Sequence, residues 1–256
     1  MNYCDPTGSA AQLYQRTLAV IDSSLAAVPL GAAVFTGGVL IGRELERGTA
    51  QLAWTQSVSP VRWLTAKLAL PALALTAGTG LLLVLRRAAL TAAPQLSNNV
   101  WYVAGSFDVL GTTVMVLPLL GLAAGALAAL LQRRTLPAAG FAGVLILLLM
   151  VCLDELRPHL WSTRTLVSPA DEGYGGITGE LVDEGAVTST GAHIPDPMCV
   201  DDQRCLADHD ITGVYREFHP ASHFWPLQLV QTATMLALAA TIIYITFRIL
   251  KRRTTT

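Results

Sequence analysis

Long apolar runs separated by short polar segments dominate the chain. A transmembrane helix needs about 20 apolar residues to cross about 30 Å of hydrocarbon. Five charge-free stretches satisfy this, and none has the short core and cleavage site of a signal peptide. The stretches are Leu25–Gly42, Leu68–Leu85, Val109–Leu131, Thr135–Leu153 and Phe224–Phe247. The pattern predicts an all-α fold, a polytopic membrane helical bundle with five spans.

The composition supports a chain that mostly faces lipid. Hydrophobic residues make up 52% of the 256 residues and charged residues only 14%, with a mean hydropathy of +0.49. A soluble domain usually carries about a quarter charged residues. The 17 basic and 18 acidic residues leave no net positive field for phosphate, so a nucleic-acid partner is excluded. The predicted environment is the lipid bilayer.

The basic residues predict the orientation. The loop 43–67, the pair 133–134 and the tail 248–253 hold ten Lys and Arg, whereas the short segments on the other side hold three. Basic short loops are cytoplasmic. The predicted order is an external N-terminal segment (1–24), four spans (25–153) with a cytoplasmic loop (43–67), an extracytoplasmic loop (154–223), a last span (224–248) and a basic cytoplasmic tail (249–256).

The extracytoplasmic loop is predicted to be mostly irregular. Its stretches Asp171–Gly176 and Asp183–Gly185 are rich in glycine and acid, which favours loop over packed strand. Cys199 and Cys205 lie where thiols oxidise, so they are candidates for a disulfide. Two unpaired thiols, or pairing with Cys4, are the alternatives.

No metal site is predicted. His219 and His223 are four residues apart, a spacing that lets one helical face offer two nitrogens to a metal. Pro220 interrupts such a helix, however, and no third ligand has a diagnostic spacing.

Catalytic motifs are absent from the sequence. It contains no Gly-x-x-x-x-Gly-Lys-Ser/Thr phosphate loop, no Gly-x-Ser-x-Gly elbow and no His-Glu-x-x-His pair. The predicted spans also lack Asp, Glu, Lys and Arg, the usual relay of an ion-driven pump. The chain is therefore predicted to be no enzyme and to carry no cofactor, and any transport energy would come from another subunit.

The loop 43–67 has a readable local structure. Gly48 suits the left-handed residue that ends a helix, and Arg43 and Arg47 suit the negative end of the helix dipole. Glu44 and Glu46 are unfavourable at that end, so we expect them to have cationic partners.

A short lateral helix, Thr49–Val58, should follow Gly48. Ala50, Ala53, Trp54 and Val58 share one of its faces. Ser59 then caps the next helix, with Pro60 as its first residue. The alternative is an elbow that merely joins two spans, although such a connection needs only a few residues.

Several motifs, in order along the chain, resemble one family. They are Glu44-x-Glu-x-Gly-Thr49, Trp54-Thr-Gln-Ser-Val-Ser-Pro-Val-Arg-Trp-Leu-x-x-Lys67, Arg133-Arg-Thr-Leu-Pro137, Arg157-Pro-His159 and His219-Pro-x-x-x-Phe-Trp-Pro-Leu-Gln228. The chain resembles permease subunits of type-2 ABC exporters, and their actinobacterial branch in particular. This resemblance implies a multi-pass protein of the bacterial plasma membrane that exports an amphiphilic or hydrophobic substrate.

The resemblance also implies partners and a site. The lateral helix would be a coupling helix that rests on a separate ABC ATPase subunit, which binds ATP and Mg. A second permease copy or a related permease would complete the transporter. The implied coupling residues are Glu44, Glu46, Arg47, Gly48, Thr49, Gln51, Trp54, Thr55, Gln56, Arg62, Trp63 and Lys67. A non-transporting membrane protein, immunity or receptor-like and acting through its extracytoplasmic loop, is the alternative.

The sequence departs from the family pattern in places. Family members have six spans, and the segment 1–24 is too short and polar to supply the first, so that span is expected to be missing. Gln231 stands where many relatives carry Glu, and Ala138-Ala139 replaces a commoner Ala-Met pair.

Small and polar residues within the spans suggest helix contacts. Gly38-x-x-x-Gly42 and Gly121-x-x-x-Gly125 allow close helix approach, and we favour packing within the subunit over an interface between permeases. For Gln228, Gln231 and Thr232 we favour hydrogen bonds to neighbouring helices over a substrate path.

Overall fold

The computed structural model describes residues 8–56, 58–92, 100–102, 106–199 and 203–254. The chain forms two compact units. The helical unit contains Met1–Val100, Ala104–Leu153 and Gln228–Thr256, and the second unit contains Trp101–Val103 and Asp154–Leu227.

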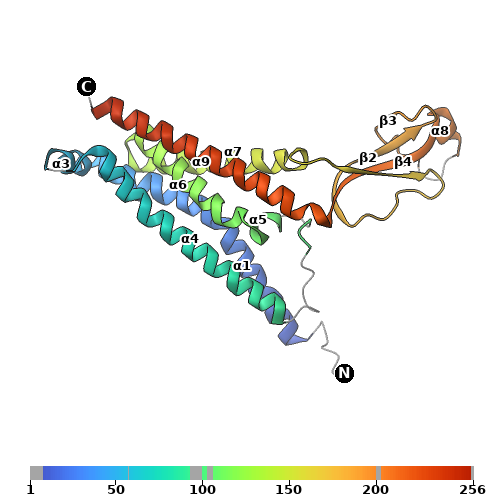
Figure 1. The fold of residues 1–256 in the computed structure, drawn as a ribbon, viewed down its shortest axis with the longest axis horizontal. Helices are drawn as coiled ribbons and strands as arrows, with labels where there is room; N and C mark the ends of the chain where they lie inside the picture. The colour runs from blue at the N-terminus through green and yellow to red at the C-terminus, as the bar shows by residue number, and fades with distance from the viewer. Residues whose placement is uncertain (1–7, 57, 93–99, 103–105, 200–202, 255–256) are drawn as a thin grey trace. The chain divides into compact units, whose positions relative to one another are not determined.

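Five helices of the described chain are long and apolar enough to cross a membrane, which confirms the predicted number. The first is composite: helix α1 (Ser9–Val34) continues through a π-helical segment, η1 (Phe35–Gly42), into α2 (Arg43–Glu46). The others are α4 (Pro60–Ala92), α6 (Thr113–Gln132), α7 (Thr135–Leu156) and α9 (Phe224–Thr254), shown in Figure 1. The short α5 (Phe107–Leu110) precedes α6.

The first two long helices extend beyond their predicted limits. Helix α1 begins at Ser9 instead of Leu25, and α4 continues to Ala92 instead of ending near Leu85. The predicted spans were limited to charge-free residues and therefore excluded Asp22 and Arg86. These two residues form an ion pair, with Arg86 Nε 2.5 Å from Asp22 Oδ1. Arg86 is buried. The pair neutralises both charges, and the two helices continue beyond it through Arg16 in α1 and Arg87 in α4, because charged residues are compatible with a helix.

Helix α6 lies at the centre of the helical unit. Most of its residues are buried, and Leu120 and Ala128 join one apolar cluster with Ala33 of α1, Ile146 of α7 and Met235 of α9. Helices α4 and α7 instead expose large apolar side chains, which suits contact with lipid. These include Leu70, Leu73, Leu81, Leu136, Val144 and Leu148.

The Gly121-x-x-x-Gly125 pattern brings α6 close to the backbone of α1. A Cβ added at Gly121 would lie 2.3 Å from the carbonyl oxygen of Pro29, and one at Gly125 would lie 2.4 Å from that of Ala33. No side chain fits at such distances. This contact supports the interpretation of the pattern as packing within one subunit.

The second unit is built around a four-stranded antiparallel sheet, which corrects the prediction of an all-α fold with a mostly irregular loop. Its strands follow the order β1-β4-β2-β3. They are β1 (Arg164–Pro169), β2 (Gly179–Thr188), β3 (His193–Ile194) and β4 (Ile211–Pro220). Short helices η3 (Arg157–His159), α8 (Gln203–Asp208) and η4 (Ala221–His223) complete the unit.

Strand β2 shows why the sheet was not predicted. Its glycines permit close backbone approach, since a Cβ added at Gly185 would lie 2.4 Å from the carbonyl oxygen of Ile194. Its carboxylates bind across to β4: Asp183 accepts from the Tyr215 hydroxyl at 3.0 Å, and Glu184 accepts from Arg216 Nε at 2.9 Å. Glycine and acid, which favour loops in isolation, therefore serve strand pairing here.

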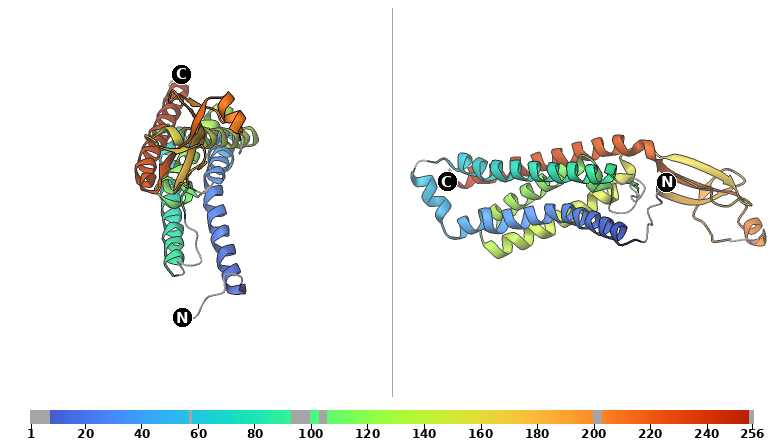
Figure 2. Two further views of the ribbon diagram at one scale, coloured as in Figure 1. Left: turned by 90° about the vertical axis from the view of Figure 1, so that its right-hand side faces the viewer. Right: turned by 90° about the horizontal axis from the view of Figure 1, so that it is seen from below.

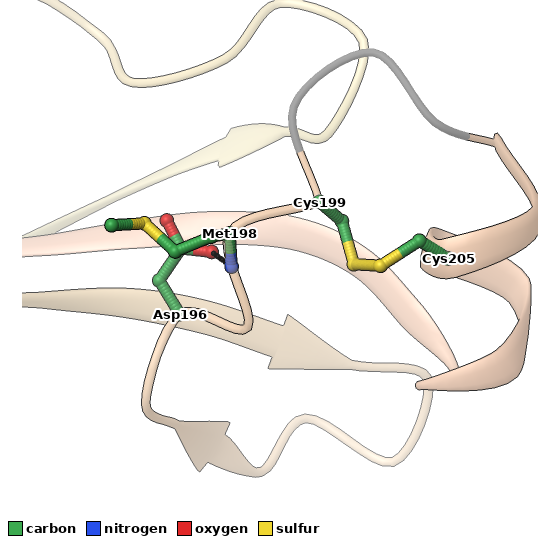
Figure 3. Close-up of a disulfide and its surroundings, with 4 residues drawn as sticks. All are labelled: Asp196, Met198, Cys199 and Cys205. Carbon is green, nitrogen blue, oxygen red and sulfur yellow. Dashed lines mark hydrogen bonds between the residues drawn. A yellow bond between two sulfur atoms is a disulfide. The ribbon is translucent and has the colours of Figure 1, made fainter.

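A disulfide joins Cys199 to Cys205 of α8, with their Cα atoms 5.5 Å apart (Figure 3). Just before it, the Asp196 carboxylate accepts a hydrogen bond from the backbone N–H of Met198 at 2.8 Å. Met198 has a left-handed backbone, with φ of 61°. The alternative partner Cys4 lies outside the described residues.

Candidate functional site

The loop 43–67 folds as two breaks around a short helix. Gly48 follows α2 with φ of +73°, as expected for a left-handed helix end. Helix α3 (Thr49–Gln56) comes next, and α4 begins at Pro60. The Ser59 hydroxyl accepts from the backbone N–H of Arg62 at 3.3 Å, which is the expected cap. Helix α3 lies at the same end of the helical unit as the C-terminal end of α9 (Figures 1 and 2).

Glu44 connects α2 to α4. One carboxylate oxygen contacts the ammonium of Lys67, and the other accepts from Trp63 Nε1 at 3.2 Å. Both charged side chains are 30% exposed. Lys67 is thus the cationic partner that the position of Glu44 requires.

Glu46 connects α2 to α7 in a different way. Its carboxylate accepts from the backbone N–H of Thr135 at 2.9 Å and from the Thr135 hydroxyl. Thr135 is the first residue of α7, where backbone N–H groups lack partners within the helix and the dipole is positive. The charges of Arg134 and Arg47 also act favourably on the Glu46 carboxylate, in line with the expected cationic partners. Its hydrogen bonds, however, come from the N-terminus of α7 and not from a cationic side chain.

The apolar face of α3 packs on its own subunit. The Trp54 ring meets the Trp63 ring edge-on, with centroids 5.6 Å apart and planes at 83°. Ala50 is fully buried in a cluster that includes Leu64 and Leu250. Trp54 is half-buried and packs against the same cluster.

The other face of α3 is exposed. Leu52 is an apolar side chain with 58% exposure. Apart from Ala66, the other exposed residues that the structure describes in this loop are polar or charged, and among the expected coupling residues they are Glu46, Arg47, Thr49, Gln51, Thr55, Gln56 and Arg62. The expected coupling residues thus fall into two groups. One is buried or half-buried and consists of Glu44, Gly48, Trp54, Trp63 and Lys67, and the other is the exposed set.

Gln228 binds neighbouring helices, as expected. Its Oε1 accepts from the backbone N–H of Thr113 at 3.2 Å and from the Thr113 hydroxyl at 3.1 Å, while its Nε2 donates to the Phe107 carbonyl at 2.7 Å. The hydroxyls of Thr112 and Thr232 are 2.7 Å apart. Gln231 is also buried, and its Nε2 lies 3.4 Å from an Asp108 oxygen.

Two histidines of the second unit, His219 and His223, contact each other, and His219 also contacts the backbone. His219 is fully buried, with Nε2 2.9 Å from the Pro158 carbonyl and Nδ1 3.2 Å from Nδ1 of His223. Among the described residues, three potential metal ligands converge at Cys199, Cys205 and His209. The two sulfurs there are bonded to each other, so they are not free thiolates.

Sequence reasoning missed two contacts that hold the helical unit together. The Asp22–Arg86 ion pair joins α1 to α4, and opposite charges flanking two neighbouring apolar runs were its signal. The second contact is the cap that Glu46 forms on the N-terminus of α7 at Thr135. Its only sequence signal was weak: a Thr directly after Arg133 and Arg134.

Comparison with known proteins identifies a family. No curated protein and no solved structure matches the chain. The model of one family, described as ABC-2 membrane transporter related, matches residues 2–157, a segment that contains four of the five long helices and the whole of the loop 43–67. With more than half of its length matched, the chain belongs to the ABC-2 membrane transporter related family and is a permease of the ABC type.

Proposed function

We propose that this permease works with a separate ABC ATPase subunit and uses its energy to export an amphiphilic or hydrophobic substrate. In this proposal the ATPase docks on the exposed face of α3 from the cytoplasm. ATP and Mg bind to the ATPase, and a second copy or a related permease completes the transporter.

The contacts around α3 are the observation that carries the proposal. Helix α3 is a separate short helix between two backbone breaks, so a partner can displace it as one piece. Glu44 ties the preceding turn to Lys67 of α4, and Glu46 ties it to Thr135 of α7. Trp54 presses α3 itself against Trp63. A push on α3 would therefore reach two membrane-crossing helices at once.

Leu52 offers the sharpest variant for testing this docking. It is exposed on α3 and is absent from the apolar clusters of the helical unit, so Leu52→Asp should leave folding intact. It should weaken binding of the ATPase, because a charge would replace an apolar contact at an interface. Gln132→Asp is a suitable control, since Gln132 is also exposed but ends α6.

The experiment co-expresses the tagged permease with the ABC ATPase encoded nearest to its gene. It measures ATPase recovered per permease in mild detergent and ATP hydrolysis in proteoliposomes. We expect both to fall about tenfold in Leu52→Asp, and in Trp54→Ala and Gly48→Pro as well, but not in Gln132→Asp. Unchanged values in Leu52→Asp, Trp54→Ala and Gly48→Pro alike would remove the coupling role and favour a non-transporting protein.

A further inference from the structure

A pocket of about 440 Å³ opens beside α3. Its walls come from α3, from the C-terminal end of α6 and from the last turns of α9, all in the helical unit. The lining residues that matter here are Trp54, Leu130, Arg133, Leu250 and Arg253. This volume lies within the range of about 300–1,000 Å³ that small-molecule sites usually have.

The polar part of the lining is basic. Arg133 follows the last turn of α6, and Arg253 lies in the last turn of α9, where both suit the negative end of a helix dipole. Arg253 donates one hydrogen bond to the Leu130 carbonyl. Neither guanidinium forms an ion pair with a carboxylate of the described chain. None of the residues known to line the pocket is acidic.

Trp54 adds a donor that lacks an acceptor. Its Nε1 is buried and has no hydrogen-bond partner among the described residues. An unpaired buried donor is costly, and native structures rarely leave one without a reason. Guanidinium and indole N–H groups can only donate. The ligand that satisfies them must therefore be rich in acceptors and negatively charged, as a phosphate group is.

The position of the pocket at the end of the apolar segment indicates which molecule would supply that phosphate. The apolar run of α6 ends at Leu131, two residues before Arg133. The pocket thus lies where the hydrocarbon gives way to the headgroup layer, with Leu130 and Leu250 contributing apolar wall beside the two arginines. A phospholipid presents the same sequence of groups, a phosphate above apolar chains, and basic pockets between membrane helices bind such headgroups.

We infer that this pocket binds the phosphate headgroup of an anionic phospholipid. The lipid would bridge α3 to the ends of α6 and α9. Its binding does not depend on the proposed function, whereas an effect of the lipid on coupling would rest on it.

The test measures lipid binding by the purified permease in detergent. Phosphatidylglycerol is the probe, and phosphatidylcholine and inorganic phosphate are the comparison ligands. Native mass spectrometry counts bound lipid, and a thermal shift titration gives the apparent Kd, since a ligand that binds only the folded state raises Tm. We expect one saturable phosphatidylglycerol per chain and no comparable shift with either comparison ligand.

Variants distinguish specific binding in the pocket from nonspecific attraction to surface charge. The double variant Arg133→Gln/Arg253→Gln should weaken phosphatidylglycerol binding by about tenfold or more, because hydrogen bonds to charged groups contribute about 1.5–3 kcal/mol. The control Arg248→Gln/Arg252→Gln loses the same charge from α9, at positions not found in the pocket lining. Trp54→Phe removes the N–H group and keeps an aromatic ring, so it should weaken binding by a smaller factor.

Each contrary result has a distinct meaning. An equal loss in the control variant, or equal shifts with phosphatidylcholine, would overturn the site in favour of nonspecific lipid association. Binding of inorganic phosphate as tight as that of phosphatidylglycerol would show a free-anion site instead. If the pocket variants retain lipid but lose the ATPase, the arginines bind an acidic partner surface and the inference is wrong. Failure of Leu52→Asp to affect the ATPase would leave the lipid result untouched.

Discussion

Gly125 of α6 lies against the backbone of Ala33 in α1, so closely that an added Cβ would sit 2.4 Å from the Ala33 carbonyl oxygen. The same hypothetical Cβ would lie 2.8 Å from Cβ of Thr36 and 2.9 Å from the backbone nitrogen of Gly37. Two of these three atoms belong to the backbone of the first long helix, which cannot move away as a flexible side chain could. The central helix of the bundle therefore depends on the absence of a side chain at Gly125.

Gly125→Ala should destabilise the helical unit by about 1–3 kcal/mol, the usual cost of overpacking a well-filled interior. Gly78→Ala is the matched control, because Gly78 is also within a long helix and nothing lies within 4 Å of its added Cβ. Thermal unfolding in detergent should show a lower Tm for the first variant alone. Equal Tm values for the two variants would mean that α1 and α6 are not in close contact.

The long helices could be predicted from sequence because each one is a local signal. A run of apolar residues long enough to cross the hydrocarbon layer as a helix suffices to identify a span. The limits of α1 and α4 were missed because Asp22 and Arg86 are 64 residues apart, and their pairing is visible only in the folded chain. Glu46 and Thr135, separated by 89 residues, present the same difficulty.

The sheet of the second unit could not be predicted from sequence, because β2 does not show the alternation of apolar and polar residues that usually identifies a strand. Glycines there are needed for contacts with β3 and β4, and Asp183 and Glu184 are needed by Tyr215 and Arg216. Tyr215 is only 6% exposed, so its hydroxyl depends on Asp183 as a hydrogen-bond partner. Burial and the hydrogen bond to Asp183 both raise the pKa of the Tyr215 hydroxyl, so it stays protonated and can donate.

Gln228→Leu should destabilise the permease by about 1–3 kcal/mol, because it leaves the Thr113 N–H and the Phe107 carbonyl without their partner in the interior. Gln228 is fully buried, so water cannot replace it without rearrangement. Thr241→Val is the control: Thr241 is exposed and its hydroxyl binds only the Ala237 carbonyl of the same helix. The measurement is again Tm in detergent, and a Gln228→Leu value equal to that of the control would contradict the network.

The Gly111 backbone approaches Gln228 so closely that an added Cβ would lie 2.3 Å from its amide carbon. Gly111→Ala should therefore displace the same amide and produce a similar loss. The double variant Gly111→Ala/Gln228→Leu should lose less than the sum of the two single losses, since both remove one network. Simple additivity in a double-mutant cycle would show that the two residues act independently.

Cys199 and Cys205 should be recovered as one peptide with an internal disulfide when the membrane protein is digested without reduction. In the chain-entropy account, the short loop that they close contributes about 2 kcal/mol to stability. Cys199→Ala/Cys205→Ala should accordingly lower the stability of the second unit, whereas Cys152→Ala, which removes a free cysteine of α7, should not. Alkylation of both residues before any reduction would show that the bridge is absent from the native protein.

Labelling of single cysteines should place residue 176 outside the cell and residue 132 inside, as the excess of basic residues in the segments 43–67, 133–134 and 248–253 predicts. Gly176→Cys and Gln132→Cys are suitable probes, because both positions are exposed and nothing lies within 4 Å of a Cβ at Gly176. The background replaces Cys4 and Cys152 but keeps Cys199 and Cys205, which are joined and do not react. An impermeant maleimide applied to intact cells should modify position 176, and position 132 only after permeabilisation. The reverse pattern would place α3 on the outer face, where no ATP-hydrolysing subunit could reach it, and would overturn the proposed coupling together with the orientation.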